Sequence, residues 1–139
     1  MPAPKLHVTG INHVVLHVTN LERSKRFYID VLGFDDRDIS DGPPSMRASF
    51  LRCGMQGLDL FEITGDPHGG QEMNHIALNV AADDIDQLVT LLTTAGIDAS
   101  RRTPRNSVFI SDPDGHCLEM LPLTASERAR ERRGTTLTE

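Results

Sequence analysis

The chain has 139 residues, 14 basic and 20 acidic side chains, and a formal net charge of −6. This length suits one domain with a substantial core, and the acidic balance argues against nucleic acid or an anionic membrane surface as a general partner. No apolar run is long enough to span a bilayer, and the first five residues lack the apolar stretch of a signal peptide. Two cysteines without a CxxC pair make no disulfide framework, so a cytoplasmic protein is expected.

The first half of the chain predicts a strand, a helix and three further strands. Thr19 and Glu22 have the spacing of a capping box at the start of the helix. Gly33 follows the last apolar position and is suited to a left-handed helix stop. The predicted elements are a strand at 11–18, a helix at 21–32, and strands near 35–40, 46–53 and 58–63.

The second half predicts the same order of elements. Asp83 and Asp84 are placed to cap its helix, and Gly96 to end it. The run Asp112-Pro113-Asp114-Gly115 has the composition of a tight turn before the last strand. The predicted elements are a strand at 73–80, a helix at 84–95, and strands near 98–102, 107–111 and 117–121.

The two halves also match residue by residue. Ile-Asn-His-Val-Val-Leu-His-Val at 11–18 and Met-Asn-His-Ile-Ala-Leu-Asn-Val at 73–80 share Asn, His, Leu and Val in register, which makes His13 and His75 equivalent. The repeat predicts an α+β fold of two tandem βαβββ modules with curved mixed sheets, and if these sheets form a cup, it can bind a metal ion. The predicted organisation is an N-terminal extension at 1–9, a main domain at 10–123 (module one 10–64, linker 65–72, module two 73–123) and a charged C-terminal tail at 124–139.

Strand alternation places four candidate ligands on the sheet faces turned away from the helices. Apolar residues of each strand should meet the helices, and His13, Asp59, His75 and Glu119 have the opposite parity. Two imidazoles and carboxylates are a suitable donor set for a divalent metal ion. Asp59 is one methylene shorter than Glu, which leaves open whether it reaches the ion or holds a bound water. Nearby Glu62 has the parity of the helix side.

Three stretches carry a resemblance to a known family: INHVVLHVTNLERSKRFYIDVLGF, MNHIALNV and SDPDGHCLEML. Together they resemble the vicinal oxygen chelate superfamily, which includes glyoxalase I, extradiol dioxygenases, methylmalonyl-CoA epimerases, fosfomycin-resistance enzymes and bleomycin-binding proteins. The resemblance covers residues 10–123. It implies paired βαβββ modules, a homodimer, and metal positions at His13, His75 and Glu119, with Asp59 where glyoxalase I usually has Glu. It implies one divalent ion per site, with Fe, Mn, Ni and Zn as candidates.

Three functions follow from this resemblance. The first is a glyoxalase-like lyase, isomerase or epimerase acting on a small molecule that chelates the metal through vicinal oxygens. The second is an iron(II) extradiol-type dioxygenase, because two histidines and one carboxylate leave open metal positions. The third is a metal-free drug-binding protein of the bleomycin-resistance type. Fosfomycin transfer is disfavoured, because those enzymes carry a threonine two residues after the first ligand, where this chain has Val15.

Other polar residues have narrower expected roles. Glu119 is the candidate to move a proton next to a metal-polarised carbonyl. His17 lies about 6.6 Å along the strand from His13, too far for a second ligand from the same strand, and is a candidate proton shuttle. Arg105 is either a clamp for a substrate carboxylate or phosphate or a solvated loop arginine. Cys117 either lines the substrate cavity or is a small apolar filler.

Overall fold

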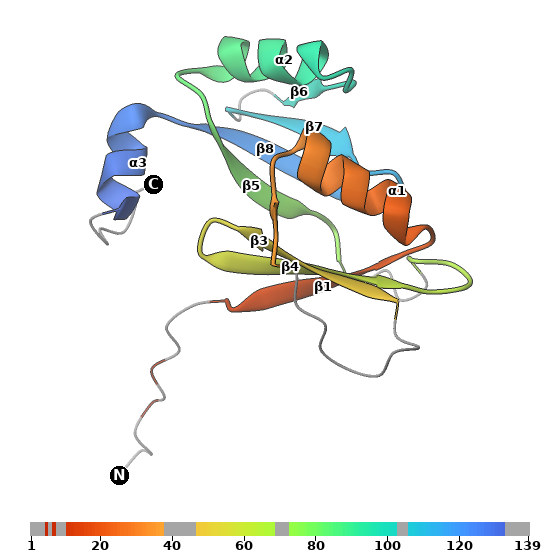
Figure 1. The fold of residues 1–139 in the computed structure, drawn as a ribbon. Helices are drawn as coiled ribbons and strands as arrows, with labels where there is room; N and C mark the ends of the chain where they lie inside the picture. Colours follow the sequence, from red (N-terminus) through yellow and green to blue (C-terminus); the bar gives the residue numbers. More distant parts are fainter. Residues whose placement is uncertain are drawn as a thin grey trace. The chain divides into compact units, whose positions relative to one another are not determined.

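The computed structural model describes residues 5, 7, 11–37, 47–68, 73–102 and 106–132. The chain divides into two compact units, residues 1–69 and 70–139. Each unit holds one βαβββ module built on an open four-stranded mixed sheet (Figure 1). The predicted α+β fold of two tandem βαβββ modules is therefore confirmed.

The first unit orders its sheet β1-β4-β3-β2. Strand β1 runs parallel to β4, and the other neighbours are antiparallel. The helix after β1 lies over one face of this sheet (Figure 1). The elements are β1 His13–Val18, α1 Leu21–Lys25, η1 Arg26–Val31, β2 Asp35–Asp36, β3 Ala48–Cys53 and β4 Gln56–Glu62.

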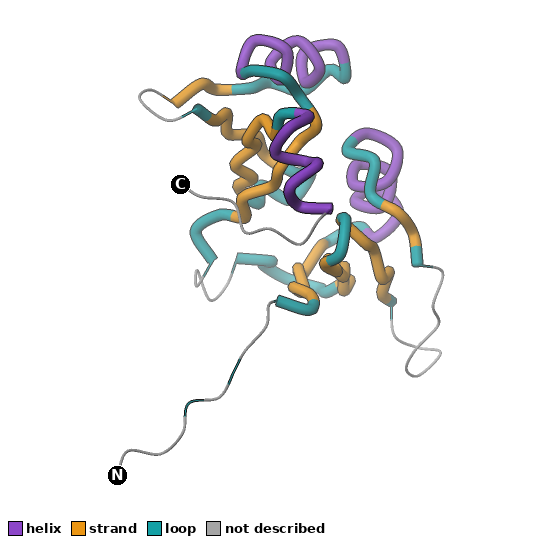
Figure 2. The backbone as a smooth tube through the Cα atoms, turned by 90° about the vertical axis from the view of Figure 1, so that its left-hand side faces the viewer, coloured by secondary structure: helices purple, strands orange, loops and turns teal. Residues whose placement is uncertain are grey.

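The second unit repeats this plan with the order β5-β8-β7-β6. Strand β5 is parallel to β8, and β8 is antiparallel to β7. Helix α2 lies outside the strand layer, as the side view shows (Figure 2). The elements are β5 Ile76–Ala81, α2 Ile85–Thr94, β6 Ser100–Arg102, β7 Ser107–Ser111, β8 Cys117–Leu123 and α3 Ala125–Arg132.

The start of the first helix differs from the prediction. Its N-cap is Asn20, whose side chain accepts a hydrogen bond from the Arg23 N–H, whereas Thr19 accepts one from the Arg23 guanidinium. The predicted capping box of Thr19 and Glu22 is therefore wrong, because the helix begins one residue later than that box requires. A capping box does form before α3, where Thr124 and Glu127 bond reciprocally.

The second half of the predicted helix at 21–32 is a π-helix, η1. Its wider turn is closed by the Leu32 N–H, which donates to the Phe27 carbonyl at 3.0 Å. Tyr28 is fully buried there and makes edge contacts with Phe27 and Phe34. Apolar spacing over so few residues does not distinguish this turn from an α-helical one, which is why the sequence prediction missed it.

The remaining helix ends agree with the prediction. Gly33 and Gly96 end the two helices with φ of 82° and 79°, in the left-handed region that favours glycine. Asp84 is the N-cap of α2 and accepts from the Gln87 N–H at 2.8 Å. None of the described helices combines the length and apolar character needed to cross a membrane.

The cores lie on the helix-facing sides of the sheets. The buried apolar strand residues on these sides are Leu16, Val18, Leu51, Leu58 and Leu60 in the first unit, and Val108, Ile110, Leu118 and Met120 in the second. They alternate with the residues of the opposite face, as a half-buried sheet requires. Most strand bounds differ from the prediction by one to three residues; β5, for example, begins at Ile76 rather than at 73.

Glu62 links the helix start to β4. Its Oε2 accepts from the Leu21 N–H at 2.8 Å, and its Oε1 accepts from Arg47 Nε at 3.2 Å. These bonds favour the charged carboxylate, and they lower the pKa of Glu62, the Leu21 N–H having the larger effect. Glu62 therefore faces the helix, as its strand parity predicted.

We expect this carboxylate to make folding pH-dependent. Its pKa is lower in the folded chain, so its stabilisation is present above the unfolded pKa of about 4.3 and is lost as pH falls through the folded value. Thermal melts from pH 7 to pH 3 should show the advantage of wild type over Glu62→Gln shrinking below about pH 5. Arg47→Ala should retain most of this pH dependence, because the Leu21 bond remains. A difference in melting temperature between wild type and Glu62→Gln that stays constant from pH 7 to pH 3 would contradict a stabilising role for the Glu62 carboxylate.

Candidate metal-binding site

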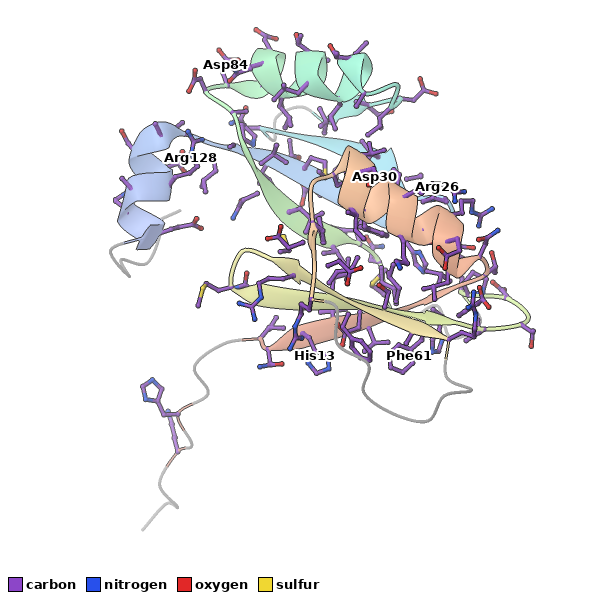
Figure 3. All side chains as sticks on the ribbon, viewed as in Figure 1. His13, Arg26, Asp30, Phe61, Asp84 and Arg128 are labelled. Carbon is purple, nitrogen blue, oxygen red and sulfur yellow. The ribbon has the colours of Figure 1, made fainter. Side chains whose placement is uncertain are left out.

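The open face of the first sheet carries the first pair of candidate ligands. In the parallel register of β1 and β4, His13 pairs with Gly57 and Val15 with Asp59, so all four residues share one face. Figure 3 shows the labelled side chains of His13 and Phe61 on the opposite side of the sheet from the helix that carries Arg26 and Asp30.

In module one, the imidazole of His13 faces the carboxylate of Asp59. The distance from His13 Nε2 to Asp59 Oδ2 is 3.8 Å. Asp59 is only 4% exposed, and its Oδ1 is buried with no hydrogen-bond partner among the described residues. Its direct cross-strand neighbours are Val15 and Phe50, so both flanks of this carboxylate are apolar.

Module two repeats the pair with a longer carboxylate. His75 Nε2 lies 3.4 Å from Glu119 Oε1, and Glu119 is 4% exposed. Its cross-strand neighbours are Ala77 and Phe109. Phe109 also makes an edge contact with the His75 ring, at a centroid distance of 5.5 Å. Glu119 differs from Asp59 in one respect: its Oε2 accepts from the Ser107 hydroxyl at 2.8 Å.

An asparagine orients each histidine. Asn12 Oδ1 lies 2.7 Å from His13 Nδ1, and Asn74 Oδ1 lies 2.7 Å from His75 Nδ1. An amide oxygen only accepts, so Nδ1 is the ring nitrogen that donates to it, and in the neutral form of the ring the lone pair is then on Nε2, the atom that faces the carboxylate. Neither asparagine was predicted as a site residue. Their recurrence beside both histidines, already visible in the repeat, was the available signal.

The donors in each module fit a divalent metal ion. A buried carboxylate between apolar neighbours is costly unless a cation or donor compensates it, and Asp59 Oδ1 has neither among the described residues. Imidazole nitrogen with carboxylate oxygen suits Zn, Mn, Fe or Ni. No three His, Cys, Asp or Glu side chains gather at one point within the described part of the chain. Each module thus supplies two of the four predicted ligands.

Of the other predicted site residues, the structure describes His17 and Cys117. His17 is exposed on the same face as His13, opposite Phe61 in the register. Cys117 is half-buried, with the strand parity of Glu119. Arg105 lies outside the described residues. His116 is buried, and its Nδ1 contacts Asp112 Oδ2 at 2.7 Å within the predicted turn.

Gly57 allows β1 and β4 to approach closely beside His13. A Cβ added at Gly57 would lie 2.8 Å from the Cβ of His13, closer than real Cβ atoms come. Both atoms are attached directly to backbone, so no side-chain rotation relieves the contact. A residue without a side chain is therefore needed at position 57, where His13 approaches Asp59.

We expect Gly57→Ala to push β1 away from β4. The overpacked contact should lower the free energy of unfolding by about 1–3 kcal/mol, measured by urea denaturation, and should shift the NMR signals of His13. Gln56→Ala, at the exposed neighbouring position, should change stability by less than about 0.5 kcal/mol. Equal behaviour of the two variants would refute a packing role for Gly57.

The two carboxylates should respond differently to neutralisation. Asp59→Asn removes a buried charge whose Oδ1 lacks a partner, so the metal-free protein should gain about 1 kcal/mol of stability. Glu119→Gln is the matched control, and it should gain less because Ser107 already satisfies Oε2. Denaturation in the presence of a chelator measures both. If Asp59→Asn instead lowers the free energy of unfolding, the charge of Asp59 is already stabilised by the protein without a metal.

Comparison with known proteins places the chain in a family. A sequence model of the Glyoxalase/Bleomycin resistance protein/Dioxygenase superfamily matches residues 10–120. The chain therefore belongs to this superfamily, as the predicted resemblance to the vicinal oxygen chelate group anticipated.

Several relatives are metal-dependent enzymes. The metallothiol transferase FosB of Shouchella clausii is 30% identical over 132 residues, covering 87% of this chain and 85% of the relative. The fosfomycin resistance protein FosX of Listeria monocytogenes is 26% identical over 133 residues, covering 88% and 96%. A mutant of the Listeria FosX, crystallised with Mn(II) and 1S,2S-dihydroxypropylphosphonic acid, superposes with a TM-score of 0.66 at 19% identity, covering 88% of this chain and 99% of that one. That superposition supports the fold.

Proposed function

We propose that the chain is a divalent-metal-dependent enzyme whose ligands are His13, Asp59, His75 and Glu119. The observation that carries this proposal is the repeated pair, in which an asparagine-held imidazole directs Nε2 at a buried carboxylate. A metal-free binding protein would not require that arrangement in both modules, which disfavours the bleomycin-type alternative. By family resemblance the proposed assembly is a homodimer, and the two cysteines without a CxxC pair favour a cytoplasmic location.

The protein's own residues prepare this site before any substrate arrives. Asn12 and Asn74 keep the protons of the two imidazoles on Nδ1, so Nε2 is available as a donor. Phe50 and Phe109 flank the carboxylates and exclude water from one side of each. A bound divalent ion would supply Lewis acidity toward neighbouring oxygens of a substrate.

For the reaction class, we propose glyoxalase-like lyase, isomerase or epimerase chemistry on a small substrate with vicinal oxygens. Glu119 is the proposed proton carrier. His17, on the open face of module one, is separately proposed as a proton shuttle. Arg105 and Cys117 remain proposed substrate contacts. An iron(II) dioxygenase remains the alternative if the loaded metal is iron and a catechol consumes oxygen.

The relatives FosB and FosX favour a second candidate, modification of fosfomycin. The cross-strand partner of Asp59 on β1 is Val15, which is 40% exposed and has no hydroxyl to offer a substrate. This apolar position is the structural reason why fosfomycin chemistry ranks second.

The first expected result is stoichiometric metal binding that depends on both modules. Purified protein reconstituted with Mn, Fe(II), Ni or Zn should hold one divalent ion per site, measured by elemental analysis and calorimetry. His13→Ala and His75→Ala should each weaken metal binding by more than about 100-fold. Removing a residue that only hydrogen-bonds to a metal ligand costs up to about 100-fold, and these histidines are proposed as ligands themselves. His68→Ala, outside both pairs, is the control. If the wild-type protein holds no divalent ion, the proposed metal-dependent function is wrong.

The metal-loaded protein then distinguishes the reactions. The panel consists of hemithioacetals of 2-oxoaldehydes, thioesters with an epimerisable carbon next to the carbonyl, catechols under oxygen, and fosfomycin with water or a thiol. Mass spectrometry and oxygen uptake identify the product. If fosfomycin is the only compound turned over, fosfomycin modification replaces glyoxalase-like chemistry as the favoured function. Oxygen uptake with a catechol would establish the dioxygenase.

A further inference from the structure

The duplicated modules differ in how they hold their carboxylates. In module two, Ser107 is 1% exposed, and its hydroxyl donates to Glu119 Oε2 at 2.8 Å. In module one, the equivalent position on β3 is Ala48, because Ala48 precedes Phe50 by two residues as Ser107 precedes Phe109. Alanine has no donor, and the carboxylate of module one has the orphaned oxygen, Asp59 Oδ1.

We propose that Ser107 is a positioning residue that sets how Glu119 binds metal, and thereby which metal the site prefers. The proposal rests on the proposed metal-dependent function. The bond to Oε2 fixes the rotation of the carboxylate and turns Oε1 toward His75 Nε2, at 3.4 Å. A carboxylate tied through one oxygen offers a metal the other oxygen, so Glu119 would hold the ion through Oε1.

Binding through one oxygen discriminates between metals. Ca²⁺ collects six to eight oxygen ligands and readily takes both oxygens of a carboxylate. Transition metals accept an imidazole nitrogen together with a single carboxylate oxygen, and Zn²⁺ needs only four donors. Burial of both Ser107 and Glu119 keeps water from replacing the serine hydroxyl. The tether therefore favours Mn²⁺ or Zn²⁺ over Ca²⁺.

Module one lacks this tether. Without a donor at position 48, nothing on β3 restrains Oδ1 of Asp59, so both of its oxygens can adjust to an ion. The two halves of a repeated sequence thus supply one fixed and one adjustable carboxylate.

The test measures metal binding instead of turnover. Mn²⁺ and Ca²⁺ are titrated separately by calorimetry into metal-free wild type, Ser107→Ala, Ser107→Thr and Ser111→Ala. Ser107→Ala should weaken Mn²⁺ binding about 10- to 100-fold, the range for loss of an outer partner. It should also lower the ratio of Ca²⁺ Kd to Mn²⁺ Kd, because freed Oε2 suits the larger ion.

The other variants make the result specific. Ser107→Thr keeps a hydroxyl and should restore the wild-type ratio. Ser111→Ala removes an exposed serine of the same strand and should leave both affinities unchanged. Melting temperatures of the metal-free proteins verify folding.

Two negative results are distinguishable. If wild type holds none of Mn, Fe(II), Ni and Zn after reconstitution, the proposed function fails, and this inference fails with it. If wild type binds Mn²⁺ while Ser107→Ala retains the wild-type ratio, the proposed function stands and the positioning role of Ser107 is overturned.

Discussion

Parallel pairing of the first and last strand of each module is the constraint on which both candidate half-sites depend. The pairing sets a register in which Asp59 on β4 pairs with Val15, two residues after His13, and Glu119 on β8 pairs with Ala77, two residues after His75. A shift by one residue would turn every side chain of the strand to the other face. The helix-facing cores make such a shift costly, so packing on one face of the sheet preserves the donors on the other.

The same pairing explains why the carboxylates are buried yet available. Asp59 lies between Val15 and Phe50, and Glu119 between Ala77 and Phe109, so apolar neighbours remove water from both flanks. Such an environment costs stability unless a cation or a donor is supplied. Module two supplies the Ser107 hydroxyl and module one supplies none. This is the pattern of stability exchanged for function at a binding site.

Much of this organisation is predictable from sequence. The repeat and strand alternation predicted the paired modules and the faces of His13, Asp59, His75 and Glu119, and they excluded Glu62, which instead caps the start of the first helix. Predictions that required hydrogen-bond geometry fared worse. The capping box was expected at Thr19 and formed at Thr124, because motif spacing alone does not say where a helix begins.

By itself, the sequence determined which side chains share a face, because the alternation of a strand is a property of consecutive residues. It also indicated the family, through motifs that recur in both halves of the chain. Only the tertiary structure decided which carboxylate oxygen has a partner. Ser107 reaches Glu119 from a different strand, 12 residues earlier in the chain, and that contact depends on the register between β7 and β8. Gly57 likewise became informative only when β1 came to lie against it.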